Sequence, residues 1–289
     1  MDFTVALAQI KPKLGLVAEN LDMVENAVEQ GIQVQAGMVI FPELALTGYF
    51  LKDLVPEVAL SLDSPEIRKL LTLSHHISIA VGFVEVTADY RFYNSALYLE
   101  EGEIRHLHRK VYLPTYGLFD EQRYLARGLR LRAFDTRFGR MGLLICEDMW
   151  HLSASYVLAM DGAATILCLS SSPGRGIMAG ENLGSTAAWR KLNATTAMFL
   201  NCRVLYCNRV GFEDGVNFWG GSEAVGPDGE MTARGKILEE DFVLAEIEEG
   251  ALRRERIFAP LMRDESLSIT LRELQRIETE RSRLCRSLG

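Results

Sequence analysis

The chain has 289 residues, of which 48% are hydrophobic and 24% charged, and its formal net charge is −8 at pH 7. This length can bury a large core, in one large domain or two smaller ones. The acidic balance argues against nucleic acid or an anionic membrane as a partner. No apolar run approaches the roughly 18 residues of a membrane span, and the opening MDFTVALAQIKP has no basic stretch, so no signal peptide is predicted.

The cysteines are scattered, and none of them stand in a C-x-x-C pair. This argues against a disulfide framework and a structural zinc site, and it predicts a protein of the reducing cytoplasm. No glycine-rich phosphate loop is present, and we expect neither a metal nor a cofactor. The five cysteines are Cys146, Cys168, Cys202, Cys207 and Cys285.

The first half of the chain alternates between strand-like and helix-like segments. Residues 19–36 place Leu21, Val24, Val28 and Ile32 on one helical face, and a second helix is predicted to begin at the Asp-Ser-Pro run of 63–65. Strands are predicted at 3–9, in the apolar run before Pro42, at 77–86 and 94–100, and as a further pair at 103–109 and 131–135.

The second half continues this alternation. A Pro-Asp-Gly turn at 227–229 predicts a hairpin. Further helices are predicted near 152–161, 184–201 and 264–284, with strands between them. About a dozen strands are too many for one flat sheet, whereas two stacked sheets with helices outside would hold them. We therefore expect a single α/β domain over 1–289, with 251–289 as a C-terminal arm and helix.

Three reactive residues stand where an apolar strand stops: Glu43, Lys110 and Cys146. Ligands gather at the carboxyl ends of strands in open α/β folds, so these side chains can converge. A carboxylate can serve as a base, a thiolate as a nucleophile, and an ammonium group as a stabiliser of developing negative charge. Each residue taken alone also has an ordinary structural interpretation.

The motifs around these residues resemble the nitrilase superfamily, the carbon–nitrogen hydrolases. They are FPELALTGY for Glu43, HRKVYLPTYGLFDEQRY for Lys110 and GLLICEDMWH for Cys146, with NSALYL, GGSEAVGPDGE and the opening VALAQIKPKLGLVAENL as further matches. LPTYGLFDE and CEDMW are most similar to the glutaminase-like amidase domain of glutamine-dependent NAD synthetases, here without the synthetase domain.

The resemblance implies a four-layer αββα sandwich and an amidase that cleaves a non-peptide amide to an acid and ammonia or an amine. In such a mechanism Glu43 takes the proton of Cys146, and the thiolate attacks the amide carbon to give a thioester. Lys110 and the backbone N–H after the cysteine stabilise the oxyanion. The implied partner is a small-molecule amide.

The resemblance also implies that the substrate contacts Tyr116, Glu121, Glu147, Ser172 and Arg175. Glu121 alternatively pairs with Arg109 or Arg123. Glu147 and Asp148 follow Cys146 directly, and we expect one of them to face the pocket and the other to brace the loop. Arg175 follows Ser172 after only three positions, whereas the glutaminase relatives have a longer spacing, so glutamine is not fixed as the substrate.

Other functions remain open on the sequence. The chain could be a glutaminase subunit that supplies ammonia to a separate synthetase, a nitrilase or N-carbamoyl amine hydrolase, or a non-enzymatic binding protein, against which the intact triad argues. His106 and His108 have no evident third metal ligand, and His151 is an alternative base. Family precedent and the apolar IFAPLM stretch in the arm predict a homodimer or higher homo-oligomer.

Overall fold

The computed structural model describes residues 2–175 and 184–287, and in this part of the chain most strands belong to one of two six-stranded sheets. In the first sheet β1, β2 and β3 run parallel, and the outer strands are antiparallel to their neighbours. The order in this sheet is β14 (Asp241–Ile247), β1 (Phe3–Gln9), β2 (Met38–Ile40), β3 (Ser78–Val86), β4 (Phe92–Glu100) and β5 (Glu103–Arg109).

The second sheet repeats this plan, with β7, β8 and β9 parallel and antiparallel strands outside them. Its order is β13 (Met231–Arg234), β12 (Glu223–Val225), β9 (Arg203–Asn208), β8 (Thr165–Ser170), β7 (Gly139–Ile145) and β6 (Phe134–Thr136). A separate hairpin joins β10 (Val210–Glu213) to β11 (Val216–Trp219).

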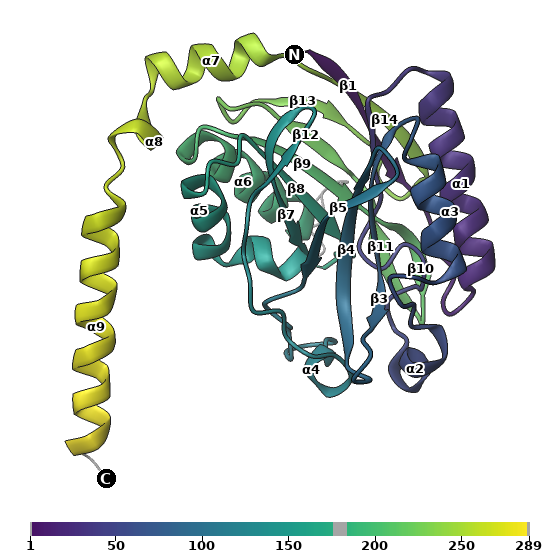
Figure 1. Cartoon of the computed structure of the whole chain (residues 1–289), viewed down its shortest axis with the longest axis horizontal. Coiled ribbons are helices and arrows are strands. Elements are labelled where there is room, and N and C mark those ends of the chain that lie inside the picture. The colour runs from purple at the N-terminus through teal and green to yellow at the C-terminus, as the bar shows by residue number, and fades with distance from the viewer. Residues whose placement is uncertain (1, 176–183, 288–289) are drawn as a thin grey trace.

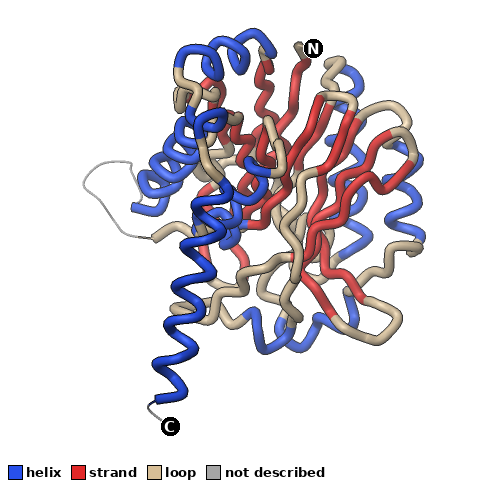
Figure 2. The backbone as a smooth tube through the Cα atoms, turned by 60° about the vertical axis from the view of Figure 1, so that its left-hand side comes forward, coloured by secondary structure: helices blue, strands red, loops and turns tan. Residues whose placement is uncertain are grey.

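Helices cover the outer face of each sheet, as Figures 1 and 2 show. α1 (Val17–Gln33) and α3 (Pro65–Leu73) pack on the first sheet, and α5 (Leu152–Met160) and α6 (Gly184–Phe199) on the second. This arrangement confirms the predicted αββα sandwich. The short helices are η1 (Lys52–Leu54), α2 (Val55–Val58), α4 (Glu121–Tyr124) and η2 (Cys146–Trp150).

Three apolar layers hold the sandwich together because the central strands bury both of their faces. In β1, for example, Val5 and Leu7 point to the other sheet while Ala6 and Ala8 point to the helices, and all four are fully buried. Such strands read as continuous apolar runs instead of alternating ones. Each fully buried Val, Leu or Ile side chain contributes roughly 1.5–3 kcal/mol.

Local signals place the helix boundaries well. Ser64 caps α3, since its hydroxyl accepts a hydrogen bond from the N–H of Ile67 at 3.4 Å, and Pro65 occupies the first turn. The expected strand pair at 103–109 and 131–135 is wrong, because β5 pairs with β4 and β6 pairs with β7 in the other sheet. Neighbours in the sequence here belong to different layers.

The arm beyond β14 leaves the sandwich, and its last helix extends away from it (Figures 1 and 2). The arm consists of α7 (Glu249–Phe258), α8 (Leu261–Asp264) and α9 (Leu267–Ser287). Leu252 is buried, and the hydroxyl of Tyr156 lies 3.1 Å from Glu265 Oε1 and 3.3 Å from Thr270 Oγ1, so the beginning of the arm is tied to the domain. No helix in the described residues has the length and apolar composition that crossing a membrane requires.

Candidate active site

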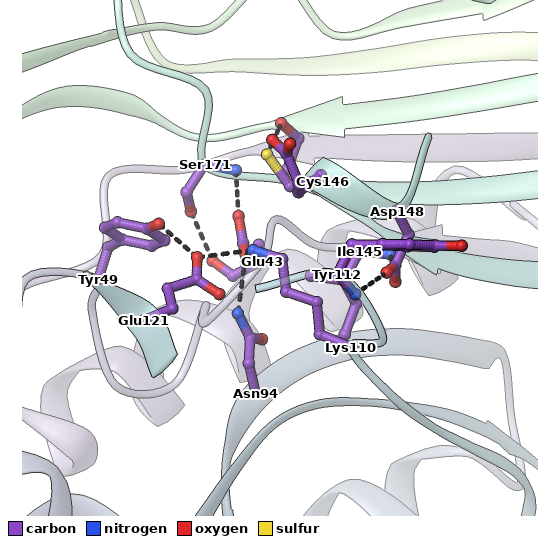
Figure 3. A network of polar contacts seen from close by, with 12 residues as sticks. Glu43, Tyr49, Asn94, Lys110, Tyr112, Glu121, Ile145, Cys146, Asp148 and Ser171 are labelled. Atoms are coloured by element: carbon purple, nitrogen blue, oxygen red, sulfur yellow. Dashed lines mark hydrogen bonds and ion pairs between the residues drawn. The ribbon is translucent and has the colours of Figure 1, made fainter. Parts of the chain in front are cut away.

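The three residues that the sequence singled out lie at one end of the two sheets. Glu43 follows β2, Lys110 follows β5 and Cys146 follows β7. β2 is parallel to β3, and β4 is antiparallel to both β3 and β5, so β2 and β5 run in the same direction. Their carboxyl ends therefore lie at the same edge of the sheet. Figure 3 shows Glu43 between Lys110 and Cys146, with Cys146 coming from the opposite sheet.

Glu43 is fully buried and held from several sides. Its Oε1 accepts from Asn94 Nδ2 at 2.8 Å and from Lys110 Nζ at 2.7 Å, and its Oε2 accepts from the N–H of Ser171 at 2.8 Å. The loop that carries Glu43 lies directly on β3, because a Cβ at Gly82 would come within 2.6 Å of a loop nitrogen. The carboxylate therefore has one fixed position between the sheets.

Lys110 is fully buried between two carboxylates. Its Nζ lies 2.7 Å from Oε1 of Glu43 and 2.7 Å from Oε1 of Glu121. Burial lowers the pKa of Lys110, but Glu121 and Glu43 outweigh burial and raise it well above the ordinary value. The lysine is therefore a permanent, immobile positive charge.

A second chain of contacts supports Glu121 from behind. The hydroxyl of Tyr49 donates to Oε1 of Glu121 at 2.5 Å. The backbone N–H of Tyr49 in turn donates to Glu213 at 2.8 Å, and Glu213 is paired at 2.6 Å with the buried guanidinium of Arg209 on the connection from β9 to β10. The hairpin thus fixes the loop that carries Tyr49, and through it the carboxylate beside Lys110.

Cys146 is the first residue of η2 and has a left-handed backbone with φ of 45°. Such a conformation is uncommon for a residue other than glycine and costs on the order of 1–3 kcal/mol. Its Sγ accepts a hydrogen bond from Ser170 Oγ at 3.4 Å. Burial, and then the charge of Glu43, raise the pKa of the Cys146 thiol, while Lys110 lowers it. Burial and Glu43 therefore favour the protonated form of the thiol in the free site.

Asp148 connects the Cys146 turn to the Lys110 loop. Its carboxylate is fully buried and accepts from the N–H groups of Val111 and Tyr112, both at 2.9 Å, and from that of Ile145 at 3.1 Å. His108, also buried, lies 2.8 Å from its Oδ2. One side chain therefore fixes the residues after Lys110 relative to the residue before Cys146.

An open cleft of 430 Å³ leads to Cys146. The predicted substrate contacts Tyr116, Glu147, Ser172 and Arg175 line it, together with Trp150 and Trp189. Glu121 does not line it, and lies instead against Lys110 and Tyr49. Of the two acids after the cysteine, Glu147 faces the cleft and Asp148 braces the loop. Residues 176–183, next to Arg175 in the sequence, lie outside the described residues.

The cleft carries both signs of charge. Glu147 accepts a hydrogen bond from the hydroxyl of Tyr116 at 2.9 Å, and burial, followed by this bond, raises the pKa of Tyr116 to about 12. The guanidinium of Arg175 lies 4.8 Å from the ring centre of Phe119, which holds it against the loop after Lys110. Ser172 accepts a hydrogen bond from Trp189 Nε1 at 2.8 Å.

His106, His108 and His151 each contact an aromatic ring or a carboxylate. His106 stacks on Phe134 at 4.2 Å, and burial lowers its pKa to about 4, while His108 is bonded to Asp148. His151 stacks on Tyr112 and lies 3.8 Å from Glu147. Within the described residues, no three His, Cys, Asp or Glu side chains are placed to hold a metal ion.

Sequence reasoning missed the residues that hold the site together. Tyr49 and Asn94 occur inside FPELALTGY and NSALYL, and Ser170 and Ser171 follow the apolar run ILCL, but the sequence assigns no contact to any of the four. The available signal was their polarity at positions that the apolar pattern predicts to be buried, since buried polar groups need partners. Which partners they find depends on the packing of the two sheets.

Two stacked mixed sheets with outer helices, and a buried carboxylate–lysine–carboxylate cluster beside a cysteine, define an αββα sandwich protein with a polar site between its sheets. The chain belongs to the carbon–nitrogen hydrolase family, whose model matches residues 4–256. Membership of this family indicates a hydrolase of carbon–nitrogen bonds. The resemblance to the nitrilase superfamily is thereby confirmed.

Particular relatives agree with this assignment. A glutamine-dependent NAD(+) synthetase of Synechocystis is 32% identical over 262 residues, which cover 84% of this chain and 46% of that protein. The structure of glutamine-dependent NAD+ synthetase from Acinetobacter baumannii matches with a TM-score of 0.78 and 29% identity, over 87% of this chain and 47% of that one. This chain thus spans about half the length of these synthetases.

A third match concerns the fold alone. A carbon–nitrogen hydrolase from Helicobacter pylori has a TM-score of 0.82 at 23% identity, and the match covers 95% of this chain and 99% of that one. The sandwich is therefore shared with a protein of similar extent as well as with part of the longer synthetases.

Proposed function

We propose that this protein is an amidase that hydrolyses a small non-peptide amide through a thioester on Cys146. The observation that carries the proposal is the contact of one buried ammonium group, Lys110, with Glu43 at 2.7 Å, beside a cysteine at the end of an open cleft. This arrangement supplies a base, a nucleophile and a fixed positive charge to one carbon atom.

The proposed acylation step conserves protons and electrons. Glu43 takes the proton of Cys146 while Sγ forms a bond to the amide carbon, and the carbonyl oxygen becomes an oxyanion beside Lys110 and the backbone N–H that follows the cysteine. The protonated Glu43 then gives its proton to the departing nitrogen as the C–N bond breaks. Ammonia or an amine leaves, and the acyl group stays on Sγ.

Deacylation reuses the same base. Glu43 takes a proton from water, whose oxygen attacks the thioester carbon, and Lys110 again stabilises the oxyanion. The C–S bond breaks, and the thiolate recovers the proton from Glu43 as the carboxylic acid leaves. The raised pKa of the Cys146 thiol supports this order of events, because a protonated thiol needs a base at the moment of attack.

A glutaminase is the second candidate, favoured by the charges of the cleft. Arg175 could pair with the carboxylate of an α-amino acid, and Glu147 with its ammonium group. The relatives named glutamine-dependent NAD(+) synthetases support this reading, and a separate synthetase could then be the partner. A nitrilase or N-carbamoyl amine hydrolase would use the same nucleophile, whereas a purely binding role would leave it unused.

Ammonia release from a panel of aliphatic amides, glutamine, nitriles and N-carbamoyl amines tests the proposal. We expect turnover of at least one amide by the wild-type chain, none by Cys146→Ala, and a covalent acyl adduct on Cys146 by intact mass when the reaction is quenched. Preference for glutamine that Arg175→Gln abolishes selectively would favour the glutaminase. Amide turnover that survives in Cys146→Ala would refute the thioester mechanism.

A further inference from the structure

A second polar cleft lies on the outer face of the first sheet, away from Cys146. It has a volume of 560 Å³, which falls within the usual range for small-molecule sites. It is formed by β4, β5, the turn before β4 and the segment 126–130. The residues of its wall that matter here are Arg91, Tyr93, Arg109, Arg127, Leu129 and Arg130.

Arg109 is held in place in this cleft by groups that are themselves buried. Its Nε and Nη2 donate to Glu85 at 2.8 and 2.5 Å, and Ser95 Oγ donates to the same carboxylate at 2.7 Å. The guanidinium also lies 4.2 Å from the ring centre of Tyr93. Glu85 is buried, so the pair is rigid, and it engages Nε and Nη2 of Arg109, which leaves Nη1 as the guanidinium nitrogen that does not contact Glu85.

The opposite wall of the cleft is the segment 126–130, and contacts with the end of β5 fix its backbone. The N–H of Gly128 donates to the carbonyl of Lys110 at 2.8 Å, and a Cβ at Gly128 would come within 2.0 Å of the carbonyl oxygen of Arg109. The segment therefore crosses the end of β5 in direct contact. Arg127 and Arg130 extend from either side of this crossing.

The charges of the cleft are not balanced from within. Glu85 neutralises Arg109, and Asp89 pairs with Arg91 at 2.9 Å on the surface, where such pairs contribute little. Arg127 and Arg130 are exposed and have no hydrogen bond or ion pair to any described residue. The cleft therefore carries an excess of positive charge, although the chain as a whole has a net charge of −8. A bound anion would neutralise this local excess.

We infer that this arginine-lined cleft is a binding site for a small phosphate-bearing ligand. Guanidinium groups form bidentate, charge-assisted hydrogen bonds with phosphate oxygens, and a pre-positioned guanidinium loses little freedom on binding. Arg127 and Arg130 would close on the phosphate, with Nη1 of Arg109 as the fixed donor. Tyr93 and Leu129 supply apolar surface for the organic part of the ligand.

Isothermal titration of the full chain with pyrophosphate, at constant ionic strength, tests the inference. We expect saturable binding by the wild type, and a dissociation constant that rises by about tenfold or more in Arg127→Gln/Arg130→Gln. The matched control is Arg253→Gln/Arg254→Gln, which removes the same charge from exposed positions on α7, at the other end of the molecule (Figure 1). This control should bind as the wild type does.

Three outcomes would overturn the inference. They are no saturable binding by the wild type, an equal loss of affinity in both double variants, and equal affinity for pyrophosphate and the dicarboxylate succinate. The first would mean that the cleft is unoccupied by phosphates, the second that only net charge matters, and the third that the arginines do not select phosphate. An unchanged far-UV circular dichroism spectrum and urea unfolding midpoint in Arg127→Gln/Arg130→Gln serve as the check that this variant is folded, whether or not the protein is an amidase.

Discussion

The Nζ of Lys110 lies 2.7 Å from Oε1 of Glu121, a carboxylate that sequence reasoning had expected to contact the substrate. The same Oε1 accepts a hydrogen bond from the hydroxyl of Tyr49, while the buried Oε2 has no hydrogen-bond partner among the described atoms. Burial raises the pKa of Glu121, although Lys110 and the hydrogen bond from Tyr49 lower it. Glu121 therefore shares one cation with Glu43, and removing that cation should cost stability.

Replacing Lys110 with Met should destabilise the fold by about 3–5 kcal/mol, because it leaves two buried carboxylates without their cation. Turnover should fall by about 10² or more, as when one oxyanion donor is lost. Urea unfolding of Lys110→Met and of Lys110→Met/Glu121→Gln measures the first effect. We expect the double variant to recover part of the stability without recovering activity. A double variant no more stable than the single one would contradict the shared-cation interpretation.

Glu121 should make stability depend on pH in a definite direction. Its pKa is raised in the folded protein, so its contribution is complete below the ordinary glutamate pKa of about 4.3 and is lost as pH rises through the higher folded-state value. The free energy of unfolding of the wild type, minus that of Glu121→Gln, should therefore fall with rising pH over this window. A difference that rises with pH would show that the pKa is depressed.

Glu43→Gln should suppress turnover by about 10² to 10⁴, since the amide keeps the shape but cannot accept the thiol proton. The loss should appear in kcat more than in KM, because the proton moves only in the transition state. His151→Gln is the matched control, and we expect near-normal turnover because its contacts are with Tyr112 and Glu147. If instead His151→Gln were inactive and Glu43→Gln active, His151 would be the base.

Alkylation of Cys146 by iodoacetamide should be slow at neutral pH and accelerate with rising pH, because burial raises the pKa of its thiol. Cys168, Cys202 and Cys207 have no exposed surface and should remain unmodified in the folded chain. Peptide mass spectrometry in a Cys285→Ser background resolves these sites. Rapid labelling of Cys146 that does not depend on pH between 6 and about 8.5 would indicate a preformed thiolate.

Asp148→Asn should destabilise the protein by several kcal/mol. The carboxylate accepts hydrogen bonds from three backbone N–H groups and contacts His108, and in the variant one of its two oxygens is replaced by an NH₂ group that cannot accept them. Activity should fall even where the variant is folded, since Asp148 fixes the Cys146 turn relative to Lys110. Asp161→Asn offers a comparison, because Asp161 also accepts a backbone N–H but lies at the surface. Equal effects of the two substitutions would argue against a special role for Asp148.

We propose that the arm joins two copies of the chain. Along α9 the side chains of Leu271, Leu274 and Ile277 are exposed, and an isolated helix of this length gains little stability without packing. Light scattering at micromolar concentration should give at least twice the mass of one chain. The triple substitution of these residues by Ser should lower that mass, and a monomeric wild type would rule out the proposal.

The sequence by itself determined the sandwich and the three residues at its strand ends. Apolar runs such as 3–9 and 165–170 are local patterns that indicate strands buried on both faces. Lys110 and Cys146 directly follow β5 and β7, and Glu43 stands three residues after the end of β2. The capped start of α3 at Ser64 is local in the same way. Features that depend only on residues close together in the sequence, such as an apolar run or a helix cap, can be predicted without knowledge of the tertiary structure.

The tertiary structure decided which side chains meet. Glu43 and Ser171 are 128 residues apart, and Asp148 and His108 are 40 apart, so no spacing rule links them. The placement of β5 and β6 in different sheets likewise depends on how the layers stack. Once strands from both sheets are packed, each buried polar group must find a partner within reach, and only the packed geometry determines which partner that is.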